Sequence, residues 1–134
     1  MHMIKGRILI VDDDRDFRDS AADFLERNGY FTIKATSGAV ALEMLEANHV
    51  DAIITDIHMP DGNGIELLNA IKLRNPDVST VIVVTGNPDL RDAEALAIAA
   101  HSVFHKPFNS KALLKSIEDI IESRTKSKAS SLSK

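Results

Sequence analysis

The sequence contains no cysteine and no tryptophan, and it has only one tyrosine and five phenylalanines among its 134 residues. Without cysteine, a disulfide framework and a thiolate metal site are excluded, and a reducing compartment is compatible with the chain. Because hydrophobic residues still make up 44% of the chain, the core must be built mainly from aliphatic side chains.

Long apolar runs and an excess of positive charge are also absent. No stretch approaches the roughly 20 apolar residues of a membrane-spanning helix, and the N-terminus lacks the long apolar segment of a signal peptide. The formal net charge of −4 argues against a general nucleic-acid-binding protein. We therefore expect one soluble, cytoplasmic domain, large enough to bury a real core, that contacts neither membrane nor nucleic acid directly.

Short apolar segments alternate with amphipathic ones along most of the chain. Five segments have the composition of strands, namely 7–11, 31–35, 52–54, 81–84 and 102–105. Helical patterns follow each of them, at about 15–28, after Ser37, at about 64–75, after Asn87-Pro88 and after Asn109. This alternation predicts an α/β fold with a parallel sheet and helices on both faces.

The strand patterns also predict the order of the sheet. Segment 31–35 alternates between apolar and polar residues and segment 102–105 is short, which suits the two edges, whereas 7–11 is continuously apolar from Ile8 and suits the centre. With right-handed crossovers, the pattern fits a doubly wound five-stranded parallel sheet of the flavodoxin-like (βα)5 type, in the order 2-1-3-4-5.

The composition changes near the C-terminus. Residues 123–134 contain five serines, four basic residues and no acid, so removing their charge of +4 from the total of −4 leaves −8 for the rest. We expect a domain over residues 1–122 and a polar, basic tail over residues 123–134 that is a linker or a disordered end.

Polar side chains stand at the ends of four expected strands. Asp12 and Asp13 follow the first strand, Asp56 follows the third, and Thr85 and Lys106 end the fourth and fifth, respectively. In the 2-1-3-4-5 order these ends share one edge, where sheets of this type bind their ligands. Asp56 could instead merely cap the following loop. Asp14, however, is available to cap the first helix, which leaves the preceding two acids without that task.

Three clustered carboxylates repel one another, by about 4 kcal/mol for each pair at about 4 Å in an effective dielectric near 20. A hard divalent cation with oxygen ligands offsets such repulsion, and Mg²⁺ suits a few carboxylates together with water and a phosphate oxygen. Lys106 supplies a positive charge that can pair with a carboxylate or a phosphoryl group. These residues predict a Mg²⁺ and phosphoryl site.

Four motifs together resemble the receiver domain of two-component response regulators, of the chemotaxis-regulator type, over about residues 8–121. They are Ile-Leu-Ile-Val-Asp-Asp-Asp at 8–14, Asp-Ile-His-Met-Pro-Asp-Gly-Asn-Gly at 56–64, the apolar-Thr-Gly that ends at Gly86, and Lys-Pro-Phe at 106–108. The resemblance implies a phosphorelay signalling switch that is a phosphoprotein, not an enzyme acting on a separate substrate. Its phosphoryl donor would be a histidine kinase, a phosphotransfer protein or a small phosphodonor.

The resemblance also implies a role for each site residue. Asp56 would accept the phosphoryl group as an aspartyl phosphate, and Thr85 and Lys106 would contact that group. The metal ligands would be Asp13, Asp56 and the backbone carbonyl of His58, with Asp12 acting mainly through water. The downstream partner stays open, as does the choice between a monomer and a phosphorylation-dependent dimer, and between a stand-alone and an excised domain.

Two departures from the family pattern bear on the output. The position three residues before Lys106, usually aromatic in the family, is Val103, and the aromatic residue is Phe104, which a strand directs to the opposite face. Gly62 and Asn63 replace the more usual methionine and aspartate. A phosphorylation-independent docking module, a pseudo-receiver, is therefore an alternative. A phosphohydrolase is a weaker one, because His58 occupies the place of its usual second acid.

Overall fold

The computed structural model describes residues 3–56, 64–74, 81–85, 102–106 and 109–132. Within these ranges the strands are β1 (Arg7–Val11), β2 (Phe31–Ala35), β3 (Ala52–Thr55), β4 (Val81–Thr85) and β5 (Ser102–His105). The helices are α1 (Arg15–Arg27), α2 (Gly38–Ala47), α3 (Gly64–Arg74) and α5 (Ser110–Leu132). The helix predicted after Asn87-Pro88 lies outside the described residues.

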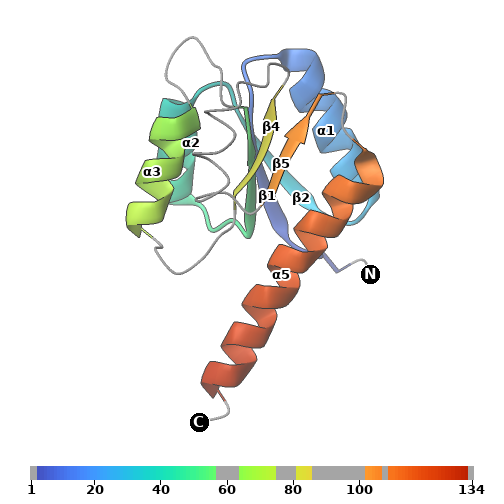
Figure 1. The fold of residues 1–134 in the computed structure, drawn as a ribbon, viewed down its shortest axis with the longest axis vertical. Helices are drawn as coiled ribbons and strands as arrows, with labels where there is room; N and C mark the ends of the chain where they lie inside the picture. The colour runs from blue at the N-terminus through green and yellow to red at the C-terminus, as the bar shows by residue number, and fades with distance from the viewer. Residues whose placement is uncertain (1–2, 57–63, 75–80, 86–101, 107–108, 133–134) are drawn as a thin grey trace.

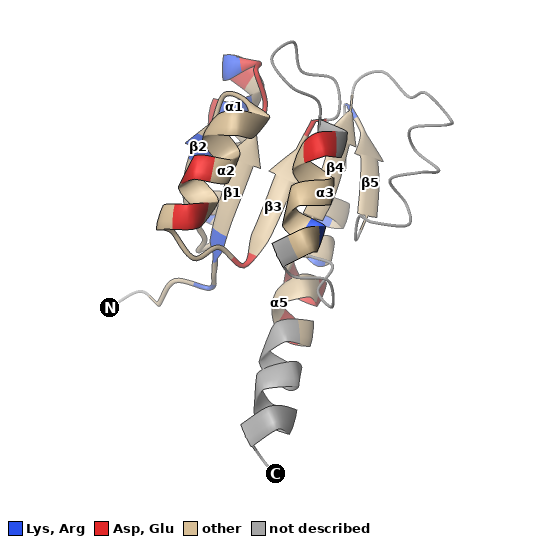
Figure 2. Cartoon of the chain, turned by 90° about the vertical axis from the view of Figure 1, so that its left-hand side faces the viewer, with Lys and Arg blue, Asp and Glu red and all other residues tan. Residues whose placement is uncertain are grey.

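The five strands form one parallel sheet in the order β2-β1-β3-β4-β5, as the sequence predicts (Figure 2). At the centre, Ile8 of β1 lies between Thr32 of β2 and Ala52 of β3. The expected edge strands, β2 and β5, are at the two edges. The strand order changes direction between β1 and β3. Asp12 and Asp56, which follow these two strands, therefore lie at the switch point of the sheet.

Alternate residues of the central strands supply two separate cores. On one face, Leu9, Ile53 and Val83 pack with α2 and α3. On the other face, Ile10, Ile54 and Ile82 pack with α1 and α5. Figure 1 shows α2 and α3 on one side of the sheet and α1 and α5 on the other. Because β1, β3 and β4 are covered on both faces, their apolar runs are continuous.

Side-chain caps begin three of the helices where the sequence predicts them. The Asp14 carboxylate accepts a hydrogen bond from the Asp16 N–H at 3.0 Å, and the Ser37 hydroxyl accepts one from the Val40 N–H at 3.2 Å. The Asn109 side chain accepts from the Lys111 N–H at 2.9 Å. At the other end of α1, Gly29 has a φ of 94°, a conformation that glycine adopts without a steric penalty. These local signals determine where α1, α2 and α5 lie relative to the strands.

Helix α5 is longer than the sequence predicts. Its apolar residues, among them Leu113, Ile117 and Ile120, are buried against the sheet, and the pattern ends near Ile121. The backbone nevertheless continues as a helix to Leu132, beyond the end of the sheet (Figure 1). Residues 123–132 of the expected tail or linker are therefore helical. Nothing breaks the helix there, because Ser, Lys, Arg and Ala tolerate helical geometry and neither Gly nor Pro occurs in that segment.

In the part of the chain that the structure describes, no helix has both the length and the apolar character needed to cross a membrane.

The fully buried residues of α5 should dominate its contribution to stability. Ile117 has no exposed surface, so Ile117→Ala leaves a cavity beneath the sheet and should lower the free energy of unfolding by about 2–5 kcal/mol. Leu73 of α3 is 86% exposed, and Leu73→Ala should change it by less than about 0.5 kcal/mol. Urea unfolding followed by circular dichroism measures both. Similar losses in the two variants would contradict the packing described here.

Candidate functional site

The site lies at the carboxyl edge of the sheet, where backbone hydrogen bonds extend beyond the last paired residues. The Asp12 N–H donates to the Ala35 carbonyl at 3.2 Å, and the Asp56 N–H donates to the Val11 carbonyl at 3.1 Å. The Lys106 N–H donates to the Thr85 carbonyl at 2.7 Å. Each residue is thereby held one position beyond a strand, so that its side chain leaves the sheet at a defined place.

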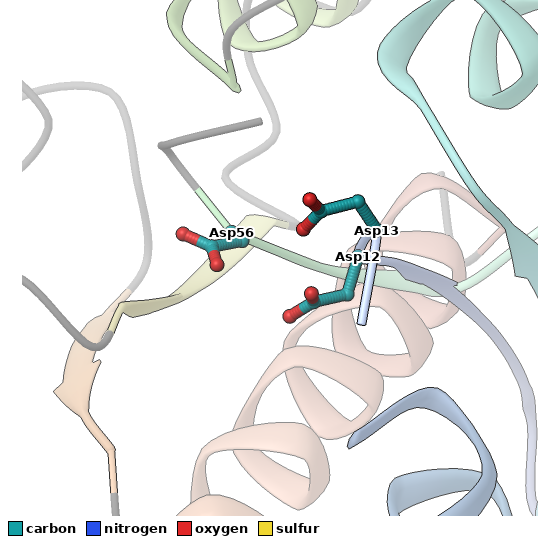
Figure 3. Close-up of side chains that lie close together, drawn as sticks. All are labelled: Asp12, Asp13 and Asp56. Carbon is teal, nitrogen blue, oxygen red and sulfur yellow. The ribbon is translucent and has the colours of Figure 1, made fainter. Parts of the chain in front are cut away.

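The three predicted aspartates come together at this edge. Asp12 is completely buried, Asp56 is 8% exposed, and Asp13 is exposed. One carboxylate oxygen from each residue lies within 4.8 Å of the other two. Figure 3 shows Asp12 and Asp13 leaving the end of β1 and Asp56 leaving the end of β3. Adjacent parallel strands thus bring together acids that are more than 40 positions apart in the sequence.

Lys106 joins this cluster as its counter-charge. Its ammonium lies 2.8 Å from Asp12 Oδ2 and 3.4 Å from Asp56 Oδ2. The sequence predicts that Lys106 pairs with a carboxylate or a phosphoryl group, and the pair with the carboxylates is present. One cation from the end of β5 therefore bridges acids that follow β1 and β3.

The ends of α1 and β1 hold the Asp12 carboxylate on its other side. The Asp14 N–H donates to Asp12 Oδ1 at 2.9 Å, so both carboxylate oxygens of Asp12 have a partner. Arg18 of α1 donates from Nη1 to the backbone carbonyl of Asp12 at 2.8 Å. Asp13 differs, because among the described residues none makes a hydrogen bond or ion pair with its carboxylate. Its oxygens are thus more available to an incoming cation than those of Asp12.

The pKa values of Asp12 and Lys106 are both raised, and in each case burial and the neighbouring charges act in opposite directions. Burial raises the pKa of Asp12 above its usual value, and the hydrogen bonds from Lys106 and from the Asp14 N–H oppose this rise. Burial alone would lower the pKa of Lys106, but its hydrogen bond with Asp12 and the negative charges of Asp12 and Asp56 outweigh this effect and raise it. The lysine is therefore held protonated beside two acids.

Two residues at the site were not identified as functional from the sequence. The ring centroid of Phe17 lies 4.2 Å from the Lys106 ammonium, and Arg18 binds the Asp12 backbone. In the sequence, Phe17 is simply the first apolar residue of a helical face, and that face is indeed packed against the core. The available signal was its position in the first turn of the helix, three residues beyond the cap Asp14 and therefore close in the chain to the acids that follow β1.

The structure describes some of the remaining predicted site residues, and the others lie outside the described residues. Thr85 is 1% exposed at the end of β4, next to Lys106. The backbone carbonyl of His58 lies outside the described residues, as do Gly62, Asn63 and Gly86. Val103 packs against the α2 and α3 face and Phe104 against the α1 and α5 face, which confirms that the two side chains point to opposite sides of the sheet.

The described residues fit a Mg²⁺ ion. Mg²⁺ prefers oxygen ligands and is commonly bound by one or two carboxylates with several waters. Asp13 and Asp56 offer carboxylates of different exposure beside the buried Asp12, and Lys106 neutralises only part of the combined charge. The donor set is all oxygen, and the exposed side of Asp13 leaves room for water.

A comparison with family models matches residues 8–118 to the response regulator receiver domain. Among curated proteins, response regulator SaeR of Staphylococcus aureus is 29% identical over 114 residues, which cover 85% of this chain and 50% of SaeR. The chain thus spans about half the length of the curated relatives that it matches.

Solved structures agree with this match. A CheY-like receiver domain protein from Methanospirillum hungatei has a TM-score of 0.82 and 33% identity, covering 90% of this chain and 97% of the other. Response regulator TrrA from Thermotoga maritima, solved in complex with Mg(2+)-BeF, has a TM-score of 0.77 and 29% identity, covering 85% of this chain and 97% of TrrA. On the family match, the fold and the acidic edge with its lysine, the chain belongs to the response regulator receiver domains of two-component signalling systems.

Proposed function

We propose that this domain is a phosphorylation switch in which Asp56 accepts a phosphoryl group with the help of Mg²⁺. The observation that carries the proposal is the position of Lys106, whose ammonium lies between Asp12 and Asp56 at the edge where three carboxylates meet. Asp56 is the acid that ends a central strand and contacts this lysine without being completely buried.

The transfer needs little from the protein beyond positioning and charge. An Asp56 carboxylate oxygen forms a bond to phosphorus, and the bond from phosphorus to the donor atom breaks, its electron pair leaving with the donor. Lys106, 3.4 Å from Asp56 Oδ2, would offset the charge on a phosphoryl oxygen, and Thr85 would donate its hydroxyl to another. The acyl phosphate product is thus held by a cation and a donor from neighbouring strands.

Asp13 and Asp56 would hold the cation directly, with the backbone carbonyl of His58 as a further ligand. Asp12 would act mainly through water, in accord with its two oxygens being engaged by Lys106 and the Asp14 N–H. When bound, Mg²⁺ supplies positive charge to the phosphoryl oxygens and reduces the repulsion among the acids. That TrrA was solved with Mg(2+)-BeF supports the same ion for this relative of it.

Receiver domains of this family work with histidine kinases or phosphotransfer proteins, and we propose one of these, or a small phosphodonor, as the source of the phosphoryl group. The domain would then act in the cytoplasm, as a monomer or as a dimer that forms on phosphorylation, and would signal to a downstream protein. In this role the domain assists its own phosphorylation and dephosphorylation but has no separate substrate.

The signal would leave through Thr85, the residues after it, β5 and α5. Val103 of β5 lies on the α2 and α3 face, at the position where the family usually has an aromatic ring. Because valine is small and its χ1 angle is restricted, we propose that the loop after Thr85 and the helix expected after Asn87-Pro88 carry most of the change. The same residue favours the second candidate function, a docking module that works without phosphorylation.

Phosphorylation should occur at Asp56 alone. Asp56→Asn removes the attacking oxygen while keeping the size of the side chain, so it should abolish labelling by a small phosphodonor with Mg²⁺, as measured by intact mass. Asp19→Asn, a change on the exposed surface of α1, should be labelled like the wild type. Unchanged labelling of Asp56→Asn would refute the assignment, and an unlabelled wild type would favour the docking module.

Mg²⁺ should bind without phosphate, and Asp13 should matter more than Asp12. Because the Asp13 carboxylate is exposed and not engaged by described residues, Asp13→Asn should weaken binding by about tenfold or more, which is ~1.4 kcal/mol. Asp12→Asn should weaken it less, because that side chain is already engaged by Lys106. Isothermal titration calorimetry measures both, and equal affinities in the two variants and the wild type would place the ion elsewhere.

Without a divalent cation, Asp12 should make the fold less stable as the pH rises. Its pKa is raised by burial, so the folded state keeps a proton that the unfolded state loses near pH 3.8, and stability falls as the pH rises through the raised pKa. Asp12→Asn lacks this loss, so its stability relative to the wild type should increase with pH across that interval.

Asp19 provides the opposite case as a control. Its pKa is lowered by the hydrogen bond from Lys34, so its contribution to stability is present above pH 3.8 and is lost as the pH falls through the lowered pKa. Asp19→Asn should therefore lose stability relative to the wild type as the pH rises. Chemical unfolding in chelator at several pH values measures both slopes, and slopes of the same sign would contradict the burial of Asp12.

A further inference from the structure

We propose that Phe17 is a positioning residue for the phosphoryl transfer, because its ring holds the Lys106 ammonium in place between Asp12 and Asp56. The inference rests on the proposed function and adds a residue to it. Phe17 matches no motif of the site, and its place in an apolar helical face assigns it to the core alone.

The distance separates this contact from the other cation–aromatic contacts of the described residues. Lys106 Nζ lies 4.2 Å from the centroid of the Phe17 ring, whereas Lys5 is 6.0 Å from Tyr30 and Arg7 is 5.6 Å from Phe31. The attraction between a cation and the negative face of a ring is significant within about 6 Å and is stronger when the cation is partly removed from water. The Lys106 side chain is 23% exposed, so this contact is partly shielded from water.

The start of α1 determines where the ring lies. The Asp14 carboxylate accepts hydrogen bonds from the Asp16 N–H at 3.0 Å and from the Phe17 N–H at 3.4 Å. The Asp14 N–H in turn donates to Asp12 Oδ1. The backbone of Phe17 is therefore tied, through Asp14, to the same aspartate that binds Lys106.

The ring supplies an attraction for Lys106 that, unlike the ion pair with Asp56, does not change during the transfer. During the transfer the charge on Asp56 changes, because one of its oxygens becomes bonded to phosphorus, so the ion pair with Lys106 changes too. The attraction to the ring does not depend on that charge and persists throughout the reaction. Phe17 would thus keep the ammonium at the phosphoryl oxygens and prevent it from turning toward solvent.

The test compares Phe17→Leu and Phe17→Trp with the wild type at saturating Mg²⁺. We expect the rate constant for labelling by a small phosphodonor to fall about three- to tenfold in Phe17→Leu and to be largely retained in Phe17→Trp. Affinity for Mg²⁺ should change less than about twofold in both, because the ring touches the lysine and not the exposed Asp13. Phe24→Leu is the matched control, since Phe24 packs in the same core about 10 Å further along α1. Its labelling rate should equal that of the wild type.

Two further experiments separate the packing of the Phe17 ring from its attraction to the charge of Lys106. Fluorinated phenylalanines at position 17 keep the shape of the ring but weaken its negative face, so the rate should fall with each added fluorine. In a Lys106→Met background, Phe17→Leu should have little further effect on the rate. Equal rates across the fluorinated series, with a labelled wild type, would overturn the role of Phe17 and leave the phosphorylation of Asp56 intact. A wild type that is not labelled at all would overturn both.

Discussion

The arrangement of the acidic edge depends on a single ammonium group. Lys106 contacts acids from β1 and β3 while its own backbone is bonded to β4, so one residue connects the ends of four strands. Removing one partner of such a pair leaves the other charge buried and uncompensated, which costs far more than the pair contributes. This cost would be largest for Asp12, which is completely buried and would lose its ion pair if Lys106 were removed. The site is therefore tolerable to the fold because the cation is present before any ligand binds.

The fold supports this arrangement through the order of its strands. β1 and β3 are neighbours although a strand and two helices separate them in the chain, and both are covered on both faces. A rigid, apolar base places the side chains that follow it with little freedom, which suits chemistry that relies on position more than on reactive groups. Asp12, Asp56 and Lys106 stand one position beyond their strands, so they do not interrupt either core.

Most of the fold could be predicted because its signals are local or periodic. Continuous apolar runs marked the central strands, and Asp14, Ser37 and Asn109 marked the beginnings of helices. The grouping of Asp12, Asp13 and Asp56 followed from the strand order. The contact of Phe17 with Lys106 could not be foreseen, because an apolar residue that covers a lysine has the same helical spacing as one that fills the core. The length of α5 was missed for a related reason: the end of an apolar face is not the end of a helix, and residues 123–132 contain no residue that breaks one.

Helix α5 has a mechanical consequence that follows from its length. Its 23 residues extend about 34 Å, roughly twice the length of a five-residue strand. The residues Leu113, Ile117 and Ile120, which are buried against the sheet, lie in its first half. The helix begins four residues after Lys106. A tilt of about 5° at its base therefore displaces Leu132 by about 3 Å. By geometry alone, the C-terminal turns would act as a lever, because a small rotation of the helix at its Ser110 end would displace Leu132 further than the residues of the site.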